Sequence, residues 1–198
     1  MTDEGKAPRA WVEARAEEIL ERVPDYIWNG EELPVPVEKI VSNTFGLLIR
    51  EVDDMTEAPG LEDERSTNVS GLLLTGPGEI WVNAAEARQW EGRKRFTICH
   101  ELGHYVIHQN SLEPTVFCRR IEVVDGEEDD GVPTSGGGPR AELEREADAF
   151  AAALLMPAEL VAARRVALAD DLATLCAEFG ASEKAMRYRL HAVPGAEA

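Results

Sequence analysis

Apolar residues recur every three or four positions over several stretches of the chain, which is the spacing of one face of an α-helix. The first stretch runs from Pro8 to about Val23, a shorter one follows Pro36, and a third covers residues 141–157. Pro8 and Pro36 suit the first turns of their helices. The pattern therefore predicts a protein rich in helices.

The middle of the chain has strand character instead. Residues 69–75 and 79–83 are rich in Leu, Ile, Val and Trp, and Gly76-Pro77-Gly78 between them is a hairpin signal. Residues 45–52 are typical of a further strand. We predict an α+β fold in which a small, largely antiparallel sheet packs beside a helix at about residues 93–108.

The chain of 198 residues fits one principal domain, which we place at residues 8–165. A C-terminal helix-turn-helix-like pair at residues 168–193 is packed on that domain or appended to it. Residues 125–140 are acidic and rich in Gly, which predicts a mobile loop, either a passive linker or a lid. No apolar run reaches the roughly 20 residues of a bilayer span, and no secretory leader is evident, so we expect a cytoplasmic protein without a membrane segment.

The segment His100-Glu101-Leu102-Gly103-His104 has the pattern His-Glu-x-x-His. Residues four apart share one helix face, so the two imidazoles can converge on one metal ion. Glu101 beside them could accept a proton from a water molecule that the metal acidifies. The surrounding apolar residues predict a buried helix, where unpartnered polar groups are costly and a metal would satisfy them. Two ordinary histidines are the alternative.

A catalytic zinc ion normally has three protein ligands, and residues 141–157 are where we expect the third. On this predicted helix Glu146 lies at the edge of the apolar stripe, in line with small alanines that allow a close approach. Glu146 is therefore the predicted third ligand and Glu142 the second choice, whereas Glu144 and Asp148 are expected to point away. Alternatively, the glutamates form a solvated face. The apolar stripe consists of Leu143, Ala147, Phe150 and Leu154.

Residues 95–105 and 146–157 together resemble the ImmA/IrrE-type metallopeptidases, and residues 80–83 are similar to the segment that precedes their metal helix. The resemblance extends from about residue 10 to residue 190. It implies that His100, His104 and Glu146 bind zinc and that Glu101 is the general base. Manganese or another divalent ion is also compatible with histidine and carboxylate ligands. Two features depart from the family pattern: Asp148 stands where Asn is common, and an acidic insertion separates the ligand helices.

The resemblance also implies a substrate. Proteins similar to this family act as regulators that cut a helix-turn-helix repressor in response to stress or DNA damage. We therefore expect a zinc-dependent endopeptidase acting on a regulatory protein. The strand at residues 79–83 could align an extended peptide by edge pairing. A non-catalytic sensor or DNA-binding regulator that retains a metal site is the alternative.

The C-terminal pair is the part of the chain that could read DNA. Gly180 suits a C-cap, Ser182 suits an N-cap, and Lys184, Arg187 and Arg189 would give the second helix a basic face. The net charge of -18 opposes direct nucleic-acid binding and favours basic partners. We expect the pair to close the core or to dock the repressor.

Three further residues near the predicted site carry weaker expectations. Tyr105 is a neighbour that could stabilise an oxyanion, although the sequence does not fix its direction. His108 is expected in packing or at the surface rather than as a ligand. Cys118 could cap the zinc through its thiolate and keep an enzyme latent, whereas Cys99 and Cys176 are interpreted as small apolar residues.

Overall fold

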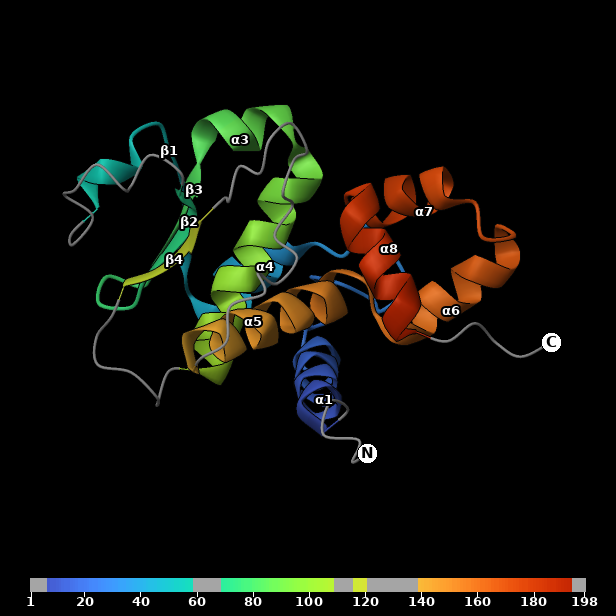
Figure 1. The fold of residues 1–198 in the computed structure, drawn as a ribbon. Coiled ribbons are helices and arrows are strands. Elements are labelled where there is room, and N and C mark those ends of the chain that lie inside the picture. The colour runs from blue at the N-terminus through green and yellow to red at the C-terminus, as the bar shows by residue number, and fades with distance from the viewer. Residues whose placement is uncertain (1–6, 59–68, 109–115, 121–138, 194–198) are drawn as a thin grey trace.

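The computed structural model describes residues 7–58, 69–108, 116–120 and 139–193. It confirms the α+β class, with a small sheet on one side of the molecule and helices around and beyond it (Figure 1). In chain order the elements are α1 (Ala7–Glu21), α2 (Val37–Phe45), β1 (Leu48–Val52), the 3-10 turn η1 (Met55–Glu57), β2 (Val69–Leu74), β3 (Glu79–Asn83), α3 (Ala84–Gln89), α4 (Glu91–Ile107), β4 (Val116–Arg120), α5 (Pro139–Leu155), α6 (Ala158–Ala167), α7 (Leu172–Phe179) and α8 (Glu183–Ala192).

The sheet has the strand order β1-β3-β2-β4. β2 and β3 form the predicted antiparallel hairpin, with Leu73 opposite Ile80. β4 is antiparallel to β2 and β1 is parallel to β3, so the sheet is largely antiparallel, as predicted. The expectation that residues 79–83 offer an edge to a peptide is wrong, because β3 is already paired on both sides, with β1 and with β2.

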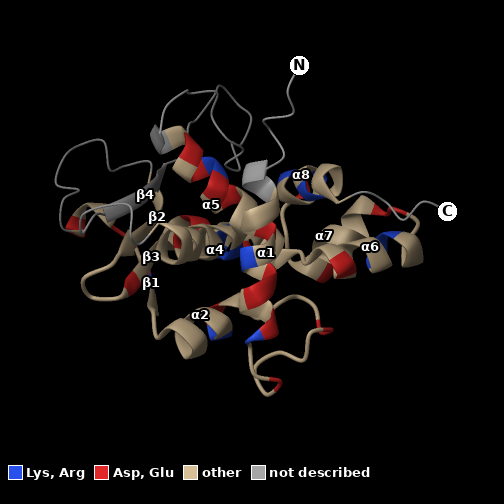
Figure 2. Cartoon of the chain, turned by 90° about the horizontal axis from the view of Figure 1, so that it is seen from below, with Lys and Arg blue, Asp and Glu red and all other residues tan. Residues whose placement is uncertain are grey.

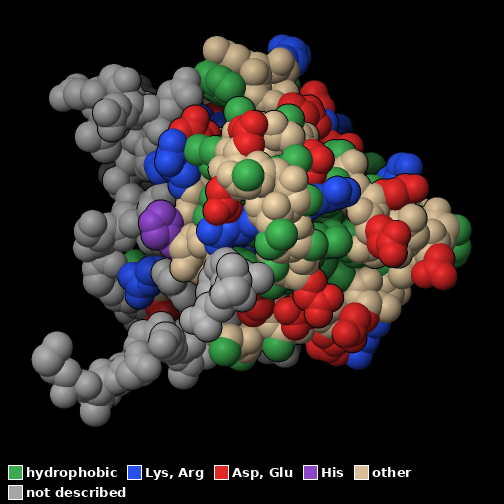
Figure 3. Space-filling model, turned by 90° about the vertical axis from the view of Figure 1, so that its right-hand side faces the viewer, with side chains coloured by type: hydrophobic (Ala, Val, Ile, Leu, Met, Phe, Trp, Pro, Cys, Tyr) green, Lys and Arg blue, Asp and Glu red, His purple; other side chains and the backbone are tan. Residues whose placement is uncertain are grey.

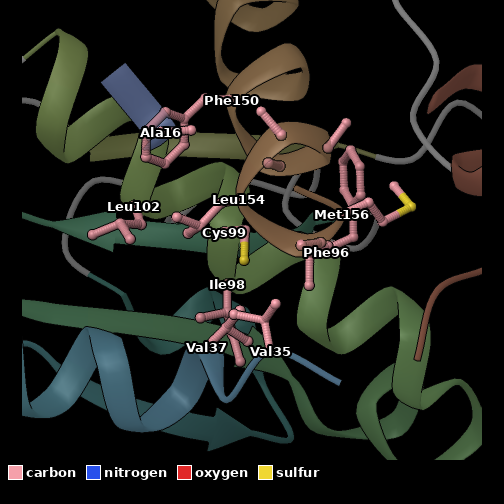
Figure 4. Close-up of a cluster of buried hydrophobic side chains, with 14 of the residues drawn as sticks. Ala16, Val35, Val37, Phe96, Ile98, Cys99, Leu102, Phe150, Leu154 and Met156 are labelled. Carbon is pink, nitrogen blue, oxygen red and sulfur yellow. The ribbon is translucent and has the colours of Figure 1, made fainter. Parts of the chain in front are cut away.

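Helix α4 is the centre of the hydrophobic core, which confirms that the His-Glu-x-x-His segment lies on a buried helix. Phe96, Ile98, Cys99 and Leu102 on α4 belong to one buried cluster that also receives side chains from α1, α2, α5, α7 and α8. Figure 4 shows Phe150, Leu154 and Met156 meeting the α4 side chains of this cluster, with Val35 and Val37 on the opposite side. The sheet, the α1–α5 helices and the C-terminal pair therefore share a continuous core.

Helices α4 and α5 cross in close contact at Gly103. A Cβ atom at this position would lie 3.1 Å from Cδ1 of Phe150 and 3.2 Å from Cα of Ala147. The absent side chain lets the backbones approach each other, and Ala147 itself is completely buried at the crossing. The crossing brings one flank of α5 against the histidine-bearing face of α4.

The C-terminal helices α7 and α8 end and begin as the sequence predicts. Gly180 has a left-handed φ of 58° and caps α7, and the Ser182 hydroxyl accepts a hydrogen bond from the backbone N–H of Ala185 at the start of α8. The turn between them packs on α4, since a Cβ on Gly92 would lie 3.0 Å from the backbone nitrogen of Ser182. The turn is therefore part of the core packing, while the division of the chain near residue 166 stays a prediction.

The sequence predicts that Lys184, Arg187 and Arg189 form a basic face on α8, and this prediction is wrong for Arg189. Arg189 is only 2% exposed, and its guanidinium donates hydrogen bonds to the Met156 carbonyl oxygen at 2.7 Å and to the Glu13 carboxylate. Arg187 is exposed but forms an ion pair with Glu183 one turn earlier. Figure 3 views the side of the molecule that carries α6–α8, where acidic and basic side chains are interspersed.

Acidic residues are spread over the described helices rather than gathered on one of them. Figure 2 shows Asp and Glu positions on α1 and α5 and around α7, with Lys and Arg scattered among them. This distribution fits a solvated acidic surface more closely than one concentrated acidic site. No helix in the described part of the chain has both the length and the apolar character needed to cross a bilayer.

Candidate metal centre

The imidazoles of His100 and His104 converge on one side of α4, as their spacing predicts. Their Nε2 atoms are 3.1 Å apart, and each residue is 1% exposed. The rings meet edge to face, with centroids 4.8 Å apart and an interplanar angle of 77°. Two ring nitrogens are therefore held together in the interior, directed at a common point.

The third group at this point is the carboxylate of Glu144 on α5. Its Oε2 atom is 3.2 Å from His100 Nε2 and 3.6 Å from His104 Nε2. Ligand atoms about 2.0–2.1 Å from a tetrahedral zinc ion are about 3.3 Å from one another. The three separations match that geometry, so these residues fit a divalent ion with one coordination position left over.

The expectation that Glu144 and Asp148 point away from the histidines is wrong. Asp148 Oδ1 is 2.8 Å from His100 Nδ1, and Glu144 completes the ligand cluster. Glu146 lies on the other flank of the α5 apolar stripe, where its Oε2 atom is 2.9 Å from Nε2 of His108. Glu142, the second choice from the sequence, is exposed. The structure thus brings Glu144, and not Glu146 or Glu142, to the histidine pair.

The error has a geometric cause. Glu144 and Glu146 are separated by about 200° around the helix, and each borders the apolar stripe on its own side. Periodicity identifies the stripe but does not determine which border faces the histidines. The choice depends on how α5 crosses α4, and that crossing is set by the close approach of Ala147 to Gly103.

Each histidine of the pair has a partner for its second ring nitrogen. His100 Nδ1 meets Asp148, and His104 Nδ1 lies 2.9 Å from Nδ1 of His108. His108 is 2% exposed and caps the C-terminus of α4. Its placement in the interior agrees with the packing expected for it, but its link to His104 was missed. The repeat of histidine at positions 100, 104 and 108 is the signal that could have indicated it.

Burial and neighbouring charges give the two histidines opposite pKa shifts. Burial acts to lower the pKa of His100, but hydrogen bonds and charge from Asp148 and Glu144 outweigh it and raise that pKa to about 9. For His104, burial together with the nearby His100 and His108 prevails over Glu144 and lowers the pKa to about 4. Although burial opposes it, the pKa of Glu144 is lowered by its hydrogen bonds to both rings. The metal-free cluster therefore holds Glu144 ionised beside a protonated His100.

Glu101 lies on the face of α4 that packs against β2. It is completely buried, and its Oε1 atom is 3.0 Å from the position that a Cβ on Gly71 would take. The same Cβ would be 2.2 Å from Cγ2 of Thr97, a distance at which atoms collide. A glycine at this point of β2 is therefore needed for the strand to lie against Glu101 and its neighbour one turn earlier.

The two remaining candidates lie elsewhere on the described chain. Tyr105 is half-buried and packs edge to face on Phe45 of α2, with ring centroids 6.2 Å apart. Cys118 lies in β4, where its Cα is paired with that of Leu72, rather than in a loop. The Cys118 side chain, like most of residues 125–140, falls outside the described residues, so its capping of the metal stays a prediction.

Comparison with known families is consistent with this arrangement. The model of an M78 peptidase family, described as the IrrE N-terminal-like domain, matches residues 59–191, which span the elements from β2 to α8. A search of curated proteins found no match. The matched region contains all the residues of the cluster and Glu101.

Proposed function

The chain belongs to the IrrE N-terminal-like family of M78 peptidases, and from this membership we propose that it is a zinc-dependent endopeptidase. The observation that carries the proposal is the clustering of His100 Nε2, His104 Nε2 and Glu144 Oε2, at separations that suit one tetrahedral ion. The donor set is two imidazoles and one carboxylate, which is a known zinc-peptidase set. Manganese would accept the same donors, so metal analysis is part of the test.

The metal would be held by His100, His104 and Glu144. When bound it supplies Lewis acidity, which polarises a peptide carbonyl and makes a nearby water molecule more acidic. Asp148 orients the His100 ring by accepting a hydrogen bond from its Nδ1–H, and Glu144 brings a negative charge that favours a cation. These residues provide binding and orientation rather than proton transfer.

Glu101 is the proposed general base. It follows His100 directly on α4 and is buried between that helix and β2. The packing of α4 on β2 therefore limits where its carboxylate can lie. It takes the proton of the attacking water and then passes it to the amine that leaves when the peptide bond breaks. Proton uptake and release by one carboxylate balance the hydrolysis.

The proposed substrate is a helix-turn-helix transcriptional repressor, cut in a stress response. The family resemblance suggests it, and the net charge of -18 would attract the basic surface that a DNA-binding protein carries. An extended segment of the substrate could pair along β4, an outer strand that contacts α4 and whose second edge has no strand partner in the described part of the chain. Such a substrate would be met in the cytoplasm.

Direct DNA reading by this chain is not part of the proposal. Arg189 donates its hydrogen bonds to Glu13 and Met156, and Arg187 forms an ion pair with Glu183. These two arginines of α8 therefore offer little positive charge to the phosphates of DNA. In the alternative function, a sensor, the metal site has no catalytic role. The Glu101→Ala variant distinguishes this sensor from a peptidase.

The test combines metal analysis with the Glu101→Ala substitution. The purified chain is expected to hold about one zinc ion and to cleave a co-expressed helix-turn-helix repressor, with the new termini identified by mass spectrometry. Glu101→Ala should keep the metal and lose cleavage, because Glu101 is not a ligand. If the variant still releases transcription in cells, the catalytic proposal fails and the sensor alternative stands.

A further inference from the structure

The least expected contacts of the site are those made by His108 and Glu146. His108 lies between two polar groups: Nδ1 of His104 on one side at 2.9 Å and Oε2 of Glu146 on the other at 2.9 Å. The ring is 2% exposed, and Glu146 is held on α5 with 17% of its side chain exposed. A buried chain of hydrogen bonds therefore links α5 to the back of a predicted metal ligand.

The direction of these hydrogen bonds follows from which atoms can donate. The Glu146 carboxylate only accepts, so Nε2 of His108 donates to it. A neutral imidazole that carries its proton on Nε2 has a lone pair on Nδ1, and this atom accepts from Nδ1–H of His104. His104 then carries its proton on Nδ1 and directs the lone pair of Nε2 toward His100 and Glu144.

From this order of donors we infer that Glu146 and His108 form a positioning relay, which holds His104 in the tautomer and orientation that metal binding requires. Glu146 acts through His108 and does not bind the metal itself. The inference rests on the proposed metal site and assigns a role to two residues that the peptidase chemistry leaves unused.

The two histidines of the site are thus supported by different means. Asp148 supports His100 directly, with one hydrogen bond of 2.8 Å, whereas Glu146 supports His104 through an intervening ring. Carboxylates in this position behind a metal-binding imidazole raise its basicity and fix its orientation, and their removal commonly costs about 10–100-fold in metal affinity. The relay should behave in the same way, since it ends on a carboxylate.

Metal affinity, measured by competition with a chromophoric chelator, is the first test. Glu146→Ala and His108→Leu should each weaken binding by about 10–100-fold, the range for lost support behind a ligand. Glu146→Gln should retain most of the affinity, because its amide oxygen still accepts from His108. Glu142→Ala is the matched control, since Glu142 is an exposed carboxylate on the same helix. Circular dichroism confirms that each variant is folded.

Two results separate a relay from a ligand. The double variant Glu146→Ala/His108→Leu should bind metal no more weakly than the worse single variant, because both substitutions break one chain. The Co²⁺-loaded Glu146→Ala variant should keep the wild-type visible spectrum, because the ligand set is unchanged. Additive losses, a changed spectrum, or an affinity equal to that of Glu142→Ala would overturn the relay.

The tautomers can be measured without any metal, by long-range ¹H–¹⁵N NMR of the histidine rings in the wild-type chain. The relay predicts a proton on Nδ1 of His104 and on Nε2 of His108. The reverse assignment would overturn it. Wild-type protein that binds no metal but shows these tautomers would disprove the proposed peptidase while the relay itself survives, so the two failures are distinguishable.

Discussion

The crossing of α4 and α5 and the seat of the α7–α8 pair both bury charged side chains, but they leave these side chains in different states. At Arg189 the guanidinium donates to Met156 and Glu13, and so links α8 to α1 and to the turn that follows α5. At the crossing, His100 and His104 have partners on one nitrogen each, and their second nitrogens meet Glu144 at one point. Three ligand-type side chains that converge on one point indicate a candidate functional site, whereas a guanidinium whose hydrogen bonds go to separate partners indicates a structural role.

Glu144→Ala should have the largest effect and should act on the metal. Loss of a ligand is expected to lower metal affinity by more than the roughly 100-fold that supporting residues contribute, and to abolish peptide cleavage. Chelator competition and a cleavage assay check this. Affinity that stays within threefold of the Glu142→Ala control would show that Glu144 is not a ligand.

Raising the pH should strengthen metal binding by about tenfold per unit up to about pH 9 and little beyond it. The reason is that His100, whose pKa is raised to about 9, must lose a proton before its Nε2 atom can bind, whereas His104 with a pKa of about 4 is already neutral. Affinities at a series of pH values give the slope. In Asp148→Asn the plateau should begin at lower pH, and a flat wild-type profile would contradict the role of Asp148.

Arg189→Met should act on stability instead. The substitution removes the donor from the Met156 carbonyl oxygen and from Glu13. We expect it to lower the free energy of unfolding by about 2–3 kcal/mol, because Arg189 is buried but its ion-pair partner Glu13 is partly exposed. Urea unfolding measures the loss. Metal affinity per folded molecule should be unchanged, and a parallel drop would mean that the two regions are coupled.

The smallest effects come from two glycines that offer a matched pair. Gly103→Ala forces α5 away from α4, and Gly92→Ala forces the α7–α8 turn away from α4, so each should cost about 1–2 kcal/mol of stability. Only Gly103→Ala should also weaken metal binding, because Glu144 moves with α5. Equal metal affinity in the two variants would show that the ligand geometry tolerates a shift of this crossing.

Much of the framework could be predicted from the sequence because it depends on local patterns. Periodicity located α1, α2 and α5, the Gly-Pro-Gly turn located the β2–β3 hairpin, and the caps at Gly180 and Ser182 located the turn between α7 and α8. Helix α3 was missed, although Asn83 caps it by accepting from Ala85 and Glu86, because this short helix follows a strand without a break.

The candidate site could be predicted only in part, for a physical reason. His100, Glu101 and His104 lie within five positions of one helix, so a single element fixes their relation. Glu144 reaches them across a contact between two helices, and no pattern within α5 encodes the angle of that contact. The repeat of histidines on α4 could have indicated the link from His104 to His108, but not the contact of His108 with Glu146, which lies on α5.

Gly71 has a consequence for how this chain tolerates mutation. Because a Cβ there would collide with Thr97 and press on Glu101, every other amino acid should be depleted at position 71 in a saturation scan selected for function. The residue carries no chemistry, yet its profile would look like that of a catalytic group. Tolerance maps of this chain would therefore mark β2 as well as Glu101, the proposed general base, although β2 itself supplies no reactive group at this position.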